Sequence, residues 1–128
     1  MIGPRRVLLA TALLAVAMSG VAACSGANPA TDFCTGYGDA MHGLVTAARQ
    51  YPINPANFSA TYKSTMDSIG QVRAKAPDDR LRSAFDRSMF TFTVFDNDAS
   101  LADFLGRADF TTNAVVLTCA EYGLDITV

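Results

Sequence analysis

The sequence has few of the residues from which catalytic and metal sites are usually built. Its 128 residues include one histidine, His42, and three cysteines. A histidine that acts as a general base needs an orienting carboxylate and a nucleophile beside it. Asp39 precedes His42 by three residues, a spacing common on the solvated face of a helix. We therefore predict no catalytic residue, no metal site and no cofactor, and an enzyme is the weakest functional hypothesis.

The motifs of nucleotide-binding and hydrolase sites are missing too. The chain contains no phosphate loop, no dinucleotide fingerprint and no serine elbow. Residues 96–98, Asp-Asn-Asp, resemble the start of a calcium loop, but the central glycine is lacking and Arg107 stands at the twelfth position. We interpret them as a capping turn.

Charge is sparse and weakly negative. The chain has 10 basic and 12 acidic residues, and Arg5 and Arg6 are the only charges in residues 1–23. Residues 24–128 therefore carry a formal net charge of −4. A mildly acidic domain argues against nucleic acid and anionic head groups as partners.

The one long apolar run lies at the N-terminus. Arg5 and Arg6 precede the apolar stretch 7–18, which is too short to cross ~30 Å of hydrocarbon comfortably. Ser19-Gly20 interrupts it, and Val21-Ala22-Ala23-Cys24 follows. These features are typical of an export signal. An uncleaved anchor over residues 7–23 and an ordinary secretory signal are the alternatives to the interpretation that follows.

The four residues that end at Cys24 resemble a bacterial lipobox. The resemblance implies that the Cys24 thiol receives a diacylglyceryl group and that residues 1–23 are removed as a lipoprotein signal peptide. Two or more acyl chains form a stable anchor, whereas one is marginal. We therefore expect a lipid-anchored protein on the extracytoplasmic side of the cell membrane. Residues 24–31 would form the lipidated N-terminus and tether, and residues 32–128 the folded domain.

Cys34 and Cys119 remain as an even pair in an exported chain. A disulfide is the default in an oxidising envelope, and two buried thiols are the alternative. The bond would close a loop of about 85 residues and stabilise the fold by roughly 4–5 kcal/mol.

Apolar residues recur at helical spacing along the folded domain. Thr31 or Asp32 is predicted to cap the first helix, and Asn54 and Pro55 to begin the second, with Ile53 packed against Phe58. Pro77 is predicted to open the third helix, residues 100–105 to form a short connecting helix, and the last helix to run from Ala108 or Asp109 to Tyr122. The predicted inward faces are Phe33, Tyr37, Met41, Leu44 and Ala48; Phe58, Tyr62, Met66, Ile69, Val72 and Ala76; Leu81, Phe85, Met89, Phe92 and Phe95; and Phe110, Ala114 and Leu117, with Val115, Cys119 and Tyr122 as further candidates in the last helix.

Four helices and a connector predict an all-α fold, an antiparallel four-helix bundle. Cys34 lies in the first turn of the first helix and Cys119 in the last turn of the final one. With an even number of antiparallel helices these two ends meet, so the topology and the cysteine pairing support each other.

The layout of the whole mature chain is similar to that of small helical lipoproteins of high-GC Gram-positive bacteria. The resemblance is carried by the lipobox, by Asp32-Phe33-Cys34 at the start of a helix, by Ala76-Pro77 in mid-chain and by Cys119 shortly before Gly123. It implies a helical fold and a location in the envelope.

Two apolar features exceed what an amphipathic bundle needs. The first is a candidate apolar surface formed by Met89, Phe90, Phe92, Val94 and Phe95. The second is a stripe of small residues, Gly36, Ala40, Gly43 and Ala47, which favours a close helix–helix approach over a docking groove. We expect the connecting helix to bury the surplus around Phe90 and Val94. The alternative is a binding groove.

These features favour a non-catalytic binding or accessory module that contacts another envelope protein. The second hypothesis is a carrier or sensor of a lipid-like small molecule among five phenylalanines, namely Phe85, Phe92, Phe95, Phe104 and Phe110. A cavity lined by these rings would favour the carrier, and an exposed apolar patch would favour the module.

Overall fold

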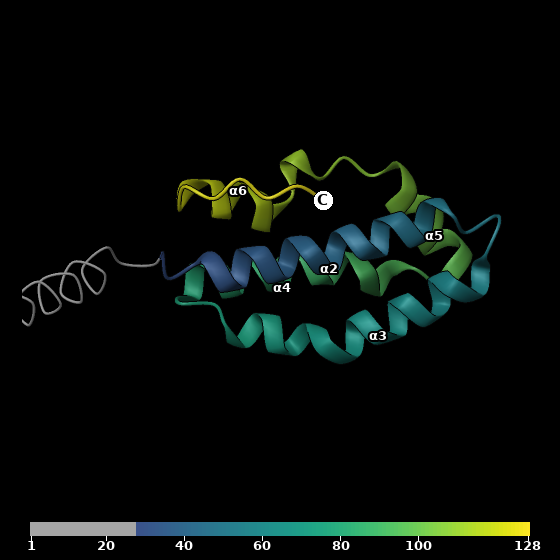
Figure 1. Cartoon of the computed structure of the whole chain (residues 1–128), viewed down its shortest axis with the longest axis horizontal. Helices are drawn as coiled ribbons and strands as arrows, with labels where there is room; N and C mark the ends of the chain where they lie inside the picture. Colours follow the sequence, from purple (N-terminus) through teal and green to yellow (C-terminus); the bar gives the residue numbers. More distant parts are fainter. Residues whose placement is uncertain (1–27) are drawn as a thin grey trace, which may run out of the picture.

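The computed structural model describes residues 28–128, so the predicted signal peptide and Cys24 lie outside the described residues (Figure 1). Within that range the chain is all-helical, and the all-α prediction is confirmed. None of its helices is both long enough and apolar enough to cross a membrane. The elements in chain order are α2 (Thr31–Arg49), α3 (Pro55–Ala74), α4 (Asp79–Phe90), the 3₁₀-helix η1 (Thr91–Val94), α5 (Asp98–Arg107), the 3₁₀-helix η2 (Phe110–Thr112) and α6 (Ala114–Glu121).

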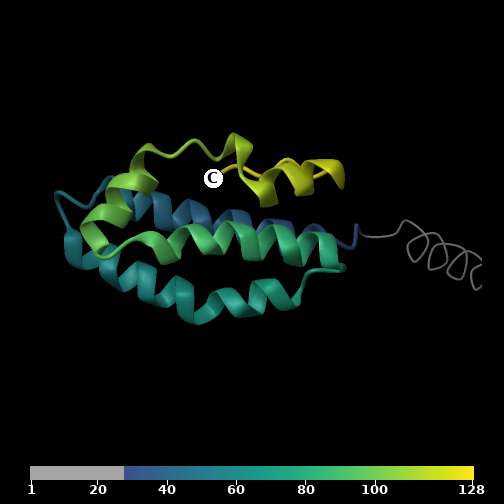
Figure 2. The ribbon, with the colours of Figure 1, turned by 180° about the vertical axis from the view of Figure 1, so that it is seen from behind.

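Helices α2, α3, α4 and α6 alternate in direction along the long axis of the domain (Figures 1 and 2). Helices α2 and α4 occupy the middle, α3 runs along one side and α6 along the other. Helix α5 closes the end opposite Asn28, where it packs on α2 and α3. The last helix is much shorter than predicted, at eight residues.

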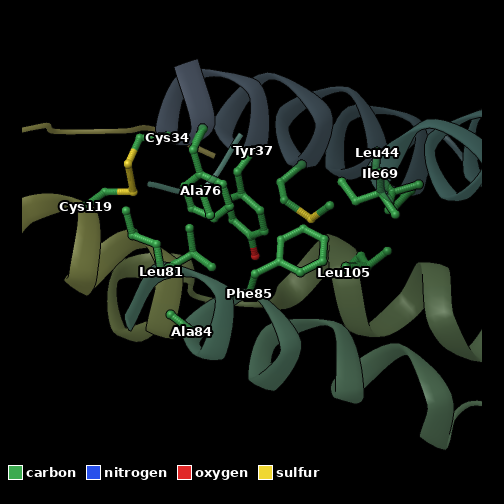
Figure 3. Packing of buried hydrophobic residues seen from close by; sticks show 14 of the residues in the cluster. Cys34, Tyr37, Leu44, Ile69, Ala76, Leu81, Ala84, Phe85, Leu105 and Cys119 are labelled. Atoms are coloured by element: carbon green, nitrogen blue, oxygen red, sulfur yellow. A yellow bond between two sulfur atoms is a disulfide. The ribbon is translucent and has the colours of Figure 1, made fainter. Parts of the chain in front are cut away.

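The core lies between α2 and the helices around it (Figure 3). All five residues of the first predicted face are buried, and Phe33 and Tyr37 meet Phe85 edge-on, with ring centroids 6.1 and 6.2 Å apart. The spacing of the apolar residues therefore predicted the buried side of α2 correctly. Phe58, Ile69 and Ala76 are buried from the second predicted face, and Leu81 and Phe85 from the third.

Two of the predicted helix starts are wrong. Helix α2 begins without a side-chain cap at Thr31 or Asp32. Instead, the Asn28 side-chain oxygen accepts a hydrogen bond from the Ala30 N–H at 3.0 Å, and this turn leads into the helix. Pro77 lies outside α4, because the Asp78 side chain accepts the Leu81 N–H at 3.0 Å and so caps the helix. The Asn54 cap with Pro55 in the first turn of α3 is confirmed.

Ile53 does not pack on Phe58, and that prediction is wrong. The N–H groups of Ile53 and Asn54 both bond to the Gln50 carbonyl, and Ile53 is 87% exposed on this turn. Tyr51 packs edge-on against Phe58 instead, at a centroid distance of 5.7 Å.

The predicted last helix is divided by two polar side chains. Asp109 binds the Thr111 N–H at 2.9 Å and begins η2, while Asn113 binds the Val115 N–H at 2.8 Å and begins α6. Ala108, Asp109 and Asn113 all have extended ψ values, of 141°, 111° and 138°. Asp and Asn side chains compete with the helix for backbone donors, and here their bonds to the N–H groups interrupt the helix.

Helix α5 is longer than predicted. It begins two residues earlier, after the Asn97 cap, and Gly106 lies inside it.

Helix α6 ends in a Schellman motif that turns the chain back over α2. Gly123 has a φ of +80°, and the Leu124 N–H bonds to the Cys119 carbonyl at 3.0 Å. The tail then passes so close to α2 that a Cβ on Gly38 would lie 3.4 Å from Ile126. A close helix–helix approach was predicted for the stripe of small residues on α2. Val72 of α3 does approach Gly36 closely, whereas nothing lies within 4 Å of a Cβ placed on Gly43.

Candidate functional site

The predicted apolar surface is divided between core and solvent. Met89, Phe92 and Phe95 are half-buried and pack against the core. Phe90 is 68% exposed and Val94 is 61% exposed. The expectation that the connecting helix buries these two side chains is therefore wrong.

The placement of α5 explains this exposure. Its Gly106 lies against Arg49 of α2, and Asp98 accepts a hydrogen bond from Ser59 of α3. On its other side Phe104 packs on Phe95, with ring centroids 5.0 Å apart. Helix α5 thus covers the end of the helical domain and leaves Phe90 and Val94 exposed.

A pocket of about 230 Å³ lies between α4, η1, α5 and η2. Its base is formed by the buried side chains of Tyr37, Ser88 and Leu105. Its walls include three aromatic side chains, Phe92, Phe104 and Phe110, together with polar ones such as Asp109 and Thr112. We call this cavity the aromatic pocket.

Three polar side chains meet at the base of the aromatic pocket. Ser88 donates to the Asn113 side-chain oxygen at 3.2 Å, and Tyr37 donates to the same oxygen at 3.4 Å. The Asn113 amide nitrogen donates back to the Tyr37 hydroxyl at 3.1 Å. Burial raises the pKa of Tyr37, so its hydroxyl remains protonated and can act as a donor.

The sequence predicted part of this site and missed the rest. Three of the five phenylalanines proposed as ligand-lining residues meet in the pocket, namely Phe92, Phe104 and Phe110. Phe85 is instead in the core, and Phe95 packs on Phe104. Ser88 and Asn113 were not predicted. Asn113 precedes the apolar residues Leu117 and Cys119 by four and six positions, and asparagine is a residue type that caps helices at such a place.

His42 and Asp39 lie on the exposed side of α2, away from the aromatic pocket. Over residues 28–128 the fold brings no group of three histidine, cysteine or acidic side chains together in a way that could hold a metal ion.

Cys34 and Cys119 join the first turn of α2 to the end of α6. Their sulfur atoms are bonded at 2.10 Å, and their Cα atoms are 6.0 Å apart (Figure 3). Beside the bridge, the Tyr122 hydroxyl bonds to Asp78 at the start of α4, and Arg80 pairs with Glu121. The bonds from Tyr122 and from the Leu81 N–H lower the pKa of Asp78. This end of the domain, which Asn28 enters, is therefore tied together from three helices.

Comparison with protein-family models, with curated proteins and with solved structures finds no match to this chain. The functional proposals therefore depend on the residues themselves and on their geometry.

Proposed function

We propose that this chain is a lipid-anchored lipoprotein on the extracytoplasmic side of a bacterial cell membrane. In this proposal Cys24 carries the lipid, and residues 32–128 form a four-helix antiparallel bundle with α5 as its connector. The domain is a non-catalytic binding or accessory module that contacts another envelope protein. The lipobox supports the anchor, and the −4 charge of residues 24–128 argues against binding to anionic head groups.

The observation that carries the binding role is the exposure of Phe90 and Val94. Burying a side chain of this size in place of leaving it in water is worth ~1.5–3 kcal/mol. Phe90 ends α4 and Val94 ends η1 four residues later, and we call these two exposed side chains the patch. A partner that covers this patch gains apolar burial without any rearrangement of the core.

The position of the patch suits a tethered module. Helix α4 starts at the end of the domain that Asn28 enters, and η1 lies beyond the far end of that helix (Figure 2). Phe90 is the last of the twelve residues of α4, so the patch would stand roughly 16 Å along the domain from the tethered end. A protein partner in the envelope could therefore approach the patch from the side.

The carrier hypothesis has weaker support. The aromatic pocket, at about 230 Å³, is smaller than the ~300–1,000 Å³ of most small-molecule sites. It therefore favours a compact molecule over a lipid.

A photo-crosslinking amino acid at position 94 tests the module proposal in the native cell. We expect one discrete protein adduct after irradiation, because a specific partner presents one surface to the patch. Phe90→Ser should reduce the adduct at least ~5-fold, since it removes about half of the apolar contact. Ile53→Ser is the matched control, because Ile53 is 87% exposed but lies on the α2–α3 turn.

Equal adduct formation in the Phe90→Ser and Ile53→Ser proteins would contradict a docking role for the patch. Adducts to lipid alone would contradict the protein partner and indicate that the patch contacts the membrane.

A further inference from the structure

We infer that the aromatic pocket binds a compact molecule that combines one flat apolar ring with a hydrogen-bond acceptor, such as an aromatic amide or ketone. The Tyr37 and Ser88 hydroxyls would donate to the acceptor, and the phenylalanine walls would hold the ring. This inference is independent of the lipid anchor and of the proposed protein partner.

The Asn113 side-chain oxygen has more hydrogen-bond donors around it than it can accept from at full strength. A carbonyl oxygen has two lone pairs. Four donors nevertheless lie around this one: the N–H groups of Val115 at 2.8 Å and Val116 at 3.3 Å, and the hydroxyls of Ser88 at 3.2 Å and Tyr37 at 3.4 Å. The two N–H groups are fixed by the start of α6, so the hydroxyls are left with the poorer bonds.

The lengths of these hydroxyl bonds support the same conclusion. Hydroxyl donors usually lie ~2.7–2.8 Å from an oxygen acceptor, and 3.2 and 3.4 Å are long. Both hydroxyls belong to buried residues, with Tyr37 0% and Ser88 7% exposed, and both line the pocket. An acceptor placed in the pocket could therefore receive shorter bonds from them than Asn113 does.

The walls and volume define the rest of the ligand. An apolar cavity of ~150 Å³ is large enough for benzene, and about 230 Å³ leaves room for a ring with a small polar substituent. Phe92, Phe104 and Phe110 come from η1, α5 and η2, so three separate elements contribute a ring. Aromatic side chains favour offset or edge-to-face contact with another ring.

The site is also connected to α6. If the two hydroxyls turn to a ligand, the Asn113 oxygen keeps only the Val115 and Val116 N–H groups. The amide resonances of these two residues should then report occupancy of the pocket directly.

The test is a titration of the ¹⁵N-labelled full chain, held in detergent micelles, with benzamide and with toluene. Free concentrations are measured from the resonances of the compounds themselves, because the micelles absorb both. We expect benzamide to shift the amides of Ser88, Val115 and Val116 in a saturable manner, with a dissociation constant on the order of 1 mM. Toluene, which lacks the acceptor, should bind at least ~5-fold more weakly.

Two variants assign the effect to the hydroxyls. Ser88→Ala and Tyr37→Phe should each weaken benzamide binding by ~3- to 10-fold and leave toluene binding unchanged. The matched controls are Ser83→Ala, on the exposed side of α4, and Tyr62→Phe, on α3, and neither should change the affinity for benzamide. The wild-type comparison of the two compounds remains decisive if a variant folds poorly.

Equal affinities for benzamide and toluene would overturn the inference, as would benzamide shifts that spread away from the pocket. The absence of saturable shifts with benzamide at several times the expected dissociation constant would overturn it as well.

Discussion

Replacing both Cys34 and Cys119 with alanine is expected to lower the free energy of unfolding by roughly 4–5 kcal/mol. The two cysteines are 85 residues apart, so their bond removes much of the conformational freedom of the unfolded chain. Total stabilities of single domains are only ~5–15 kcal/mol, so a loss of this size removes a large share of the total and should lower the urea midpoint strongly. Urea unfolding followed by circular dichroism measures the change.

Reduced wild-type protein is the matched control for the cysteine variant, because it loses the bond but keeps both side chains. Its stability should fall by a similar amount. A loss below about 1 kcal/mol in both proteins, or two free thiols in protein kept away from reductant, would contradict the pairing and with it the register of α2 and α6.

Replacing Cys24 with alanine is expected to abolish acyl labelling of the protein. Each buried methylene contributes ~0.8 kcal/mol to membrane binding, so the loss of two chains removes the anchor. The variant should either leave the membrane fraction or remain there as a precursor that still carries residues 1–23. Metabolic labelling with a fatty-acid probe, followed by fractionation, measures both effects.

Ser83→Ala, on the exposed side of α4, is the control for the lipid experiment, because it changes the folded domain and leaves both the lipobox and the disulfide intact. It should keep full acyl labelling. Unchanged labelling of the Cys24→Ala protein would contradict the lipidation proposal.

The sequence predicted those features of the fold that depend on local pattern. The spacing of Phe33, Tyr37, Met41 and Leu44 identified the buried face of α2 because a helix returns to the same face every 3.6 residues. Asn54 with Pro55 identified the start of α3 because both residues favour that position. The pairing of Cys34 with Cys119 was predicted because they are the two cysteines left in an exported chain, and the expected helix topology was consistent with it.

Other features depend on competition between neighbouring groups, which spacing does not report. The last helix was predicted as continuous because its apolar residues recur at helical spacing, but Asp109 and Asn113 bind backbone N–H groups and divide it. Ile53 was placed inward by a capping pattern, yet the turn at Gln50 directs it to solvent. The exposure of Phe90 and Val94 depends on where α5 packs, which is a tertiary property.

The aromatic pocket was only partly predictable for the same reason. Its phenylalanines stand out in the sequence because of their size and apolar character. Tyr37 and Asn113 are 76 residues apart and meet only because α2, α4 and α6 pack together. Tyr37 fits the apolar face of α2, and nothing in its sequence context shows that its hydroxyl has a polar partner.

The central claim is that fatty chains, bound to Cys24, hold a helical domain at the outer face of a bacterial membrane. The most direct test is the intact mass of the protein extracted from its native membrane with detergent. We predict a chain that begins at Cys24 and carries the added mass of a diacylglyceryl group or a more highly acylated form. An unmodified chain, or one that still begins at Met1, would contradict the claim.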